Sequence, residues 1–232
     1  MNKAFFGMAM MTALGLASCA NKSAQQQEEA APEAAASNSE IRINCLFKVA
    51  PENVANIVNL SKELVAASRN DGGNIDYDIY QSQTDPTQLM IFETWKDQES
   101  LDKHSAAEHF TTLVPQIAEL GQMQLDSMQA GAEPEGEFVL RLNCPTVVTE
   151  ETREAAIELC KELVEASRAD EGNISYDAFV SCTDPCKMLI FETWQNQEVL
   201  DKHSAAEHFT RLVPQIQELG SLEVETFKLA AE

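Results

Sequence analysis

An internal repeat constrains the fold of this chain more than any other feature of its sequence. The segment Leu101–Thr111 recurs without a change at Leu200–Thr210, and Ile91–Trp95 recurs at Ile190–Trp194. Every matching segment lies 99 residues after its counterpart. Because this offset is constant from the first predicted strand to the last helix, each copy is expected to be a whole domain.

The repeat also predicts how the two copies associate. We place the domains at residues 40–129 and 137–232, with 130–136 as a short linker containing glycine and proline. Two copies are too few for a solenoid, which usually needs at least three units. The economical interpretation is a fused homodimer, in which each copy packs against the other around a pseudo-two-fold axis.

Hydrophobic periodicity within the first copy predicts the order βαββαβ. Residues 40–49 alternate between two different faces, as a half-buried strand does. Pro51 suits the first turn of a helix that ends near Arg69. The later segments are strands at 75–83 and 89–95, helical pieces at about 97–104 and 106–119, and a strand at about 122–128.

This order is the ferredoxin-like α+β arrangement, whose sheet carries helices on one face only. The uncovered face must be buried by something else. In the first strand of each copy that face is expected to carry Arg42 and Asn44, or Arg141 and Asn143. We therefore expect two ferredoxin-like repeats packed as an intramolecular dimeric α+β barrel.

The first 39 residues are predicted to export and anchor the chain. The apolar run Ala4–Leu16 is shorter than the ~20 residues of a membrane span, so residues 1–18 are predicted to be a signal peptide. The run ends in Leu-Ala-Ser-Cys, which resembles a bacterial lipobox with Cys19 as the lipidated residue. The alternative is an ordinary signal peptide with a chance cysteine. Residues 19–39 are polar and are predicted to be a disordered tether.

The formal net charge of −22 limits the possible partners. A strongly acidic surface repels phosphate backbones and anionic lipids, so nucleic acid is not an expected partner. Membrane contact is expected through the lipid anchor, which places the protein in the cell envelope as a periplasmic or outer-membrane lipoprotein.

A series of motifs in each copy is similar to that of a known family. The series is Gly-Asn-Ile-x-Tyr-Asp, Thr-Asp-Pro, Ile-Phe-Glu-Thr-Trp and Leu-Asp-x-His-x-x-x-x-His-Phe. It resembles the antibiotic biosynthesis monooxygenase (ABM) domain of the quinol monooxygenase type. The resemblance implies a dimeric α+β barrel and the oxidation of a quinol or similar electron-rich aromatic with O₂, without a cofactor. Other members of the family have different chemistry.

Cofactor-free oxygenation needs a base, a dry aromatic pocket and donors for a developing oxyanion. We expect one pocket per copy, between sheet and helices, with asparagine as oxyanion donor, tryptophan as stacking face and histidine as base. The expected catalytic residues are Asn44, Asn143, Trp95, Trp194, His104 and His203. The expected substrate-pocket residues are Arg42, Arg141, Phe92, Phe110, Phe191 and Phe209.

Structural roles for the same side chains remain open alternatives. Trp95 suits core packing, Asn44 a satisfied buried amide, and His104 a bridge between helices. A second function is therefore kept: a non-catalytic lipoprotein that binds a quinone-like or apolar small molecule. A metal site is not expected, because His104 and His109 are five residues apart and would lie about 140° apart on an ideal helix.

The cysteines of the two domains divide by position. Cys45 and Cys144 are equivalent positions on the apolar face of a strand and are predicted to be inert core thiols. Cys182 and Cys186 flank the turn Thr-Asp-Pro of the second copy. In an oxidising envelope we expect a disulfide between them. A redox motif fits less well, because three residues separate the pair instead of two.

Overall fold

Each copy of the repeat forms one βαββαβ unit in the computed structural model, which describes residues 40–231. The first unit contains β1 (Ile41–Val49), the 3-10 turn η1 (Pro51–Asn53), α1 (Val54–Ser68), β2 (Asn74–Ser82), β3 (Gln88–Trp95), α2 (Gln98–Ser105), α3 (Glu108–Ala118) and β4 (Gly121–Gln129). The second contains β5 (Phe138–Val148), α4 (Arg153–Ser167), β6 (Asn173–Ser181), β7 (Lys187–Trp194), α5 (Gln197–Ser204), α6 (Glu207–Leu219), β8 (Gly220–Leu222) and β9 (Glu225–Ala230).

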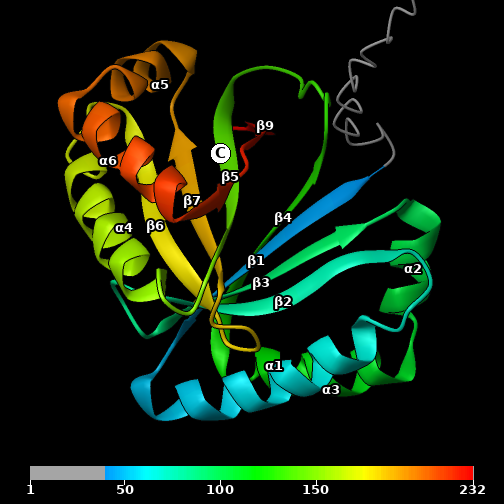
Figure 1. Cartoon of the computed structure of the whole chain (residues 1–232). Coiled ribbons are helices and arrows are strands. Elements are labelled where there is room, and N and C mark those ends of the chain that lie inside the picture. Colours follow the sequence, from blue (N-terminus) through cyan, green and yellow to red (C-terminus); the bar gives the residue numbers. More distant parts are fainter. Residues whose placement is uncertain (1–39, 232) are drawn as a thin grey trace, which may run out of the picture. The chain divides into compact units, whose positions relative to one another are not determined.

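The strands form one antiparallel nine-stranded sheet in the order β4-β1-β3-β2-β6-β7-β5-β8, with β9 also paired to β5. Pairing of β2 with β6, from Tyr80 opposite Ser181 to Ser82 opposite Phe179, joins the two repeats. Figure 1 shows α1 and α3 side by side against the strands of the first repeat, and α4 and α6 against those of the second. The predicted fold class is confirmed: two ferredoxin-like repeats form a pseudo-dimer within one chain.

The predicted signal peptide, the predicted lipid site Cys19 and the tether lie outside the described residues. Residues 40–231 belong to one compact unit. Within that range, no helix is long and apolar enough to cross a membrane.

Side-chain alternation along β3 separates two cores. Ile91 and Trp95 face the helices and pack with Leu64 of α1, so we call this side of the sheet the helix-side face. Met90 and Phe92 point the other way and pack with the equivalent side chains of the second repeat. We call this side the interior face. It is the face that the sequence left uncovered, and the other repeat buries it.

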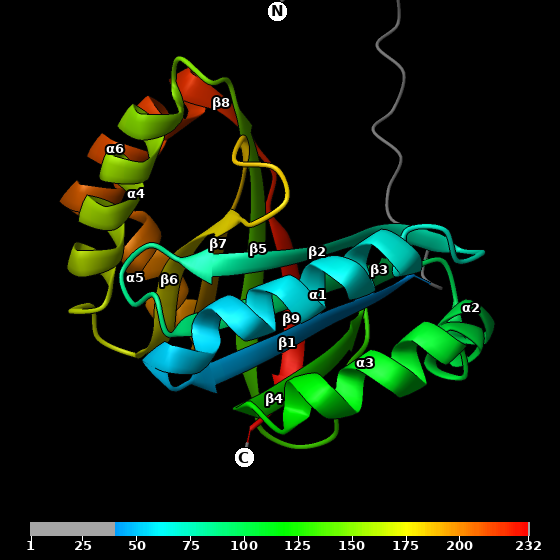
Figure 2. The same ribbon diagram turned by 90° about the horizontal axis from the view of Figure 1, so that it is seen from below.

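Two ion pairs related by the pseudo-symmetry connect the ends of the sheet. Arg42 of β1 contacts Glu225 of β9 at 2.6 Å, and Arg141 of β5 contacts Asp126 of β4 at 2.7 Å. Each arginine is 99 residues from the other, and so is each acid. Figure 2 shows β4, β9, β1 and β5 converging between the two helix layers, and β4 contacts β9 directly.

A second pair of polar networks holds each strand to the turn of the other repeat. The buried carboxylate of Asp78 accepts hydrogen bonds from Ser181 Oγ and Thr183 Oγ1, both at 2.7 Å. It also forms an ion pair with Arg69 at 3.1 Å. In the second repeat, Asp177 accepts from Thr84 Oγ1 at 2.8 Å and pairs with Arg168 at 3.3 Å, which are the counterparts of the Thr183 and Arg69 contacts. The interface is therefore specified by buried charge as well as by apolar packing.

One substitution between the repeats explains why their last strands differ. Strand β4 is continuous, whereas its counterpart is divided into β8 and β9. Leu46 of β1 lies opposite Gln124 of β4, but the equivalent residue in β5 is Pro145. Pro145 accepts a hydrogen bond from Glu223 N at 3.0 Å but has no N–H to return. The edge strand is interrupted at this point.

We predict that Asp78→Ala lowers the free energy of unfolding by roughly 2–3 kcal/mol, because it leaves two hydroxyls and Arg69 without their charged acceptor. The matched control is Glu99→Ala, which removes only the exposed pair with Lys103 and should cost less than about 0.5 kcal/mol. Urea unfolding of both variants measures the difference. Equal losses would contradict the role assigned to the network.

Candidate functional site

A pocket of about 610 Å³ lies between the sheet and helices α5 and α6 of the second repeat. Its volume is within the range of small-molecule sites. Exposed Val224, in the interruption between β8 and β9, lies among its lining residues. Apolar side chains make most of the wall, including Leu142, Leu163, Ile190, Leu200, Phe209 and Val213. Cys144, Tyr176 and Glu192 supply polar groups from the sheet.

Glu192 is the most unusual of these groups, because it is a carboxyl in the middle of a buried strand. Alternation along Ile-Phe-Glu-Thr-Trp places Glu192 and Trp194 on the same, helix-side face. Glu192 is 4% exposed and accepts a hydrogen bond from Trp194 Nε1 at 2.8 Å. Burial raises the pKa of Glu192, and hydrogen bonds with Trp194 and Tyr176 oppose the rise. Such a carboxyl can exchange a proton inside an apolar pocket.

The first repeat holds the same arrangement around Glu93. Trp95 Nε1 donates to Glu93 at 2.8 Å, and burial raises the pKa of Glu93 to about 7. The sequence prediction did not include either glutamate. The sequence did contain an indication of their role. Each glutamate is a charged residue within a mainly apolar strand, and the same residue recurs at the equivalent position of both copies.

The predicted grouping of asparagine, tryptophan and histidine in one pocket is wrong. Asn44 lies opposite Phe92 and shares its interior face, whereas Trp95 faces the helices, where His104 packs on it. Asn143 Nδ2 donates to Asn44 Oδ1 at 3.2 Å, so the two amides meet each other between the repeats. Since residues an odd number apart along a strand occupy opposite faces, neither asparagine reaches the tryptophan side.

The predicted pocket walls also divide between the two faces. Phe92 and Phe191 belong to the interior core, and the two arginines form the ion pairs between repeats. The interior-face residues that were expected in the helix-side pocket are Arg42, Arg141, Phe92 and Phe191. Phe209 does line the pocket, and Phe110 occupies the equivalent helix position, with its ring 4.8 Å from that of His104.

His104 lies on the helix side in an aromatic environment. Its ring stacks on Trp95 with centroids 4.4 Å apart, and its Nδ1 lies 2.7 Å from Asp71 Oδ2. Burial lowers the pKa of His104, and Asp71 opposes this effect. The imidazole is therefore expected to be neutral near pH 7. His203 repeats these contacts with Trp194 and Asp170.

His104 and His109 do not lie on one continuous helix, so the predicted separation of about 140° is wrong. Helix α2 ends at Ser105 and α3 begins at Glu108, so the chain turns between His104 and His109. The two rings are 5.5 Å apart, and His109 Nε2 lies 3.0 Å from Asp71 Oδ2. Each cluster therefore combines donor types that divalent metals accept, with the atoms within 4.8 Å of one another. The short His104–Asp71 contact also ties α2 to the turn after α1.

The predicted Cys182–Cys186 disulfide is absent, and both residues are free cysteines in the described part of the chain. The reason is that they pack in different cores. Cys182 lies against the core of the first repeat, and Cys186 against that of the second. Cys45 is a buried thiol whose pKa is raised to about 12 by burial, as expected for an inert position, whereas Cys144 lines the pocket.

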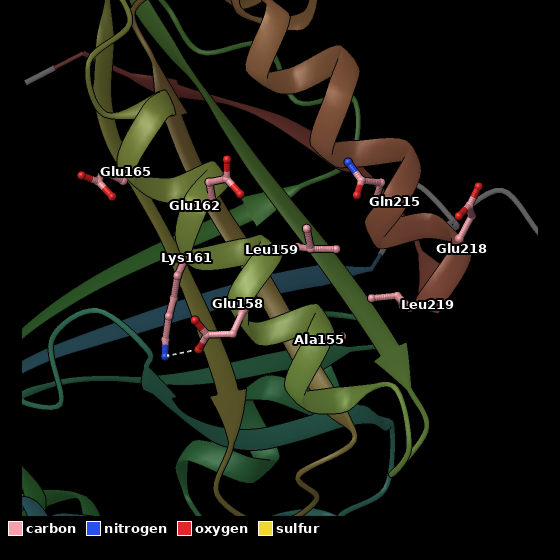
Figure 3. A pocket seen from close by; sticks show the side chains of 9 residues that line it. All are labelled: Ala155, Glu158, Leu159, Lys161, Glu162, Glu165, Gln215, Glu218 and Leu219. Atoms are coloured by element: carbon pink, nitrogen blue, oxygen red, sulfur yellow. Dashed lines mark hydrogen bonds and ion pairs between the residues drawn. The ribbon is translucent and has the colours of Figure 1, made fainter.

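A groove of about 660 Å³ between α4 and α6 lies on the outer side of the helices. Figure 3 shows its glutamates spread along the two helices instead of converging on one point. Glu158 pairs with Lys161 at 2.9 Å, and both side chains are substantially exposed. The groove thus lacks the buried polar groups that distinguish the helix-side pocket.

The fold and site define a class: a tandem ferredoxin-like pseudo-dimer with a buried glutamate between sheet and helices. The family model "Antibiotic biosynthesis monooxygenase" matches residues 41–116 and 146–215. The chain belongs to this family, and the match covers a large part of both repeats. Membership places it among monooxygenase-like proteins.

Three similar proteins each match a length of about one repeat. "Putative monooxygenase YcnE" of Bacillus subtilis is 29% identical over 86 residues, which cover 37% of this chain and 90% of the relative. An uncharacterized Synechocystis protein is 28% identical over 74 residues, 32% of this chain, and the match spans only half of that relative's length. A crystal structure of a Bacteroides thetaiotaomicron protein of unknown function, described as a possible oxidoreductase, is 44% identical with a TM-score of 0.40. It covers 40% of this chain and 100% of its own.

We predict that Glu93 makes stability fall as pH rises. Its pKa is about 7 in the folded state and near 4.5 when unfolded, so the folded state keeps the proton up to a higher pH. The stabilisation is complete below pH 4.5 and is lost as pH rises through 7, which amounts to roughly 3 kcal/mol. Glu93→Gln should remove this part of the pH dependence.

Denaturant unfolding at pH 5 and pH 8 provides the measurement. Glu99→Gln, at an exposed position, is the control and should keep the wild-type pH dependence. An unchanged fall in stability between the two pH values in Glu93→Gln would show that this carboxyl is not the titrating group.

Proposed function

We propose that this chain is a cofactor-independent monooxygenase that oxidises a quinol or similar electron-rich aromatic with O₂ in the helix-side pocket of the second repeat. Family membership supports a monooxygenase-like role. The observation that carries the proposal is Glu192, a buried carboxyl with a raised pKa in an otherwise mainly apolar pocket.

The reaction begins with a proton transfer. The Glu192 carboxylate takes the hydroxyl proton of the bound phenol, and the resulting phenolate passes one electron to O₂. The two radicals combine at the ring carbon, and Glu192 returns its proton to the peroxide. The O–O bond then breaks as the ring C–H proton leaves. One oxygen atom stays in the quinone, and the other departs with two hydrogens as water.

Neighbouring groups have supporting roles in this scheme. Tyr176 lies beside Glu192, and burial raises the pKa of its hydroxyl, so the hydroxyl stays protonated and can donate to a developing oxyanion. Trp194 fixes the carboxyl through its 2.8 Å hydrogen bond and acts as a positioning residue. Phe209 and the aliphatic wall exclude water, which strengthens these electrostatic interactions.

We predict that the full-length chain consumes O₂ with a reduced quinol among a panel of quinols and phenols. Glu192→Gln should lower the rate about 100-fold or more, because it removes the base. The wild-type rate should rise with pH through the raised pKa of Glu192, since only the carboxylate accepts the proton. Glu198→Gln, at an exposed position on α5, is the control and should retain the rate.

Two results would contradict the enzyme proposal. The first is saturable quenching of tryptophan fluorescence by quinols without O₂ uptake, which would favour the binding-protein alternative. The second is full activity in Glu192→Gln, which would place the chemistry elsewhere.

We further propose that the lipobox-like sequence holds this activity at the cell envelope through Cys19. The motivation is the apolar run that ends in Leu-Ala-Ser-Cys. Cys19→Ala should shift the protein from the detergent phase to the aqueous phase in Triton X-114 partitioning, because the acyl chains supply the membrane affinity. Detergent-phase retention of the variant would argue against lipidation at this residue.

A further inference from the structure

A second pocket, of about 580 Å³, lies where β4 of the first repeat meets the interior face of the second. Its charged groups are Arg141 and Asp126. The Arg141 side chain is 7% exposed, and its guanidinium lies 4.0 Å from the ring centroid of Phe191. An arginine so deeply buried needs acceptors for its donors, because an unpaired buried charge is costly.

The protein supplies acceptors for only part of this guanidinium. Arg141 Nε donates to Thr193 Oγ1 at 2.9 Å, and Nη1 donates to Asp126 at 2.7 Å. Among residues 40–231, Nη2 makes no hydrogen bond, and it is not one of the fully enclosed side-chain atoms that lack a partner, so the pocket side of the guanidinium is open to a ligand. Burial lowers the pKa of Arg141, opposed by the single carboxylate of Asp126.

Arg42 is the pseudo-symmetric counterpart of Arg141, and all three of its guanidinium nitrogens have acceptors. Arg42 donates from Nε and Nη2 to Glu225 at 2.9 and 2.6 Å, and from Nη1 to Glu40 at 3.1 Å. It therefore contacts two carboxylates, and its pKa is raised. Arg141 occupies the equivalent position in the second repeat but contacts only one.

The missing carboxylate corresponds to a single residue difference. Glu40 lies two residues before Arg42, and the residue two before Arg141 is Val139. Residues two apart in a strand share a face, and Val139 lines the pocket beside the arginine. The second repeat thus has an apolar space where the first repeat places its second carboxylate.

We propose that this inter-repeat pocket binds a small apolar carboxylic acid, whose carboxylate takes the place that Glu40 holds in the first repeat. The carboxylate would accept from Arg141 Nη2, because planar guanidinium matches carboxylate geometry. The apolar body would lie on Val139, Leu229, Ile174 and Leu46, which line the same pocket. The Arg42 site shows that this environment accommodates one arginine with two carboxylates.

This site is separate from the proposed active site and does not depend on it. Arg141 lies on the interior face of β5, whereas Glu192 faces the helices from β7. A ligand in one pocket is therefore separated from the other by the sheet.

Isothermal titration of the full-length chain with octanoate tests the proposal, with octan-1-ol as a neutral probe of equal length. Octanoate should bind once per chain, and octan-1-ol about 10- to 100-fold more weakly, because it lacks the charged acceptor. Val139→Glu supplies the carboxylate from the chain itself and should weaken octanoate binding by a similar factor. Val139→Thr, close in size but uncharged, should retain binding.

Arg141→Met should also abolish binding, and circular dichroism distinguishes this loss from unfolding. Val139→Glu keeps the arginine and keeps the test valid if Arg141→Met fails to fold. Equal binding of octan-1-ol and octanoate would overturn the proposal, because the arginine would then have no role. Wild-type affinity in Val139→Glu would place the ligand elsewhere, and no heat of binding with millimolar octanoate would exclude the site.

Discussion

Burial of one sheet face by the other repeat is the constraint on which the rest of the structure depends. A ferredoxin-like sheet has helices on one side only, and an exposed second side would leave aromatic rings such as Phe92 and Phe191 in water. Fusion of two copies supplies the covering sheet within the same chain. The polar groups on this face, including Asp78 and the paired asparagines, then serve the interface. Only the helix-side face is left for a pocket between sheet and helices.

The same constraint explains which parts of the fold could be predicted from sequence. The 99-residue offset, the βαββαβ order and the buried interior face all follow from repeat and periodicity, and the structure confirms them. The environment of side chains in the hairpin turn was predicted less well from the sequence. Only three residues separate Cys182 from Cys186 in the chain, but the turn between them passes from one core to the other. Sequence distance does not report that change of environment.

The candidate site was only partly predictable, because strand alternation fixes relative faces and not the identity of the functional face. Trp95 and His104 were correctly expected to be neighbours, and their rings stack. Asn44 was assigned to the same site, although it lies opposite Phe92 on the interior face. Because Glu93 and Trp95 are two residues apart in a strand, their side chains are expected on the same face. A charged residue in a strand commonly faces solvent, whereas here both faces of the strand are buried, so the environment of Glu93 depends on the packing of the whole fold.

The two repeats also show how small differences create sites on a symmetric scaffold. Pro145 replaces Leu46 and removes a backbone donor, so the edge strand divides beside the helix-side pocket. Val139 replaces Glu40 and removes a carboxylate, so a buried arginine faces the interior pocket. Each change subtracts a polar partner that the first repeat retains. Since a buried group without its partner is energetically unfavourable, each position is one where a bound molecule or solvent can restore an interaction. The first repeat is thus the internal reference against which both pockets of the second are interpreted.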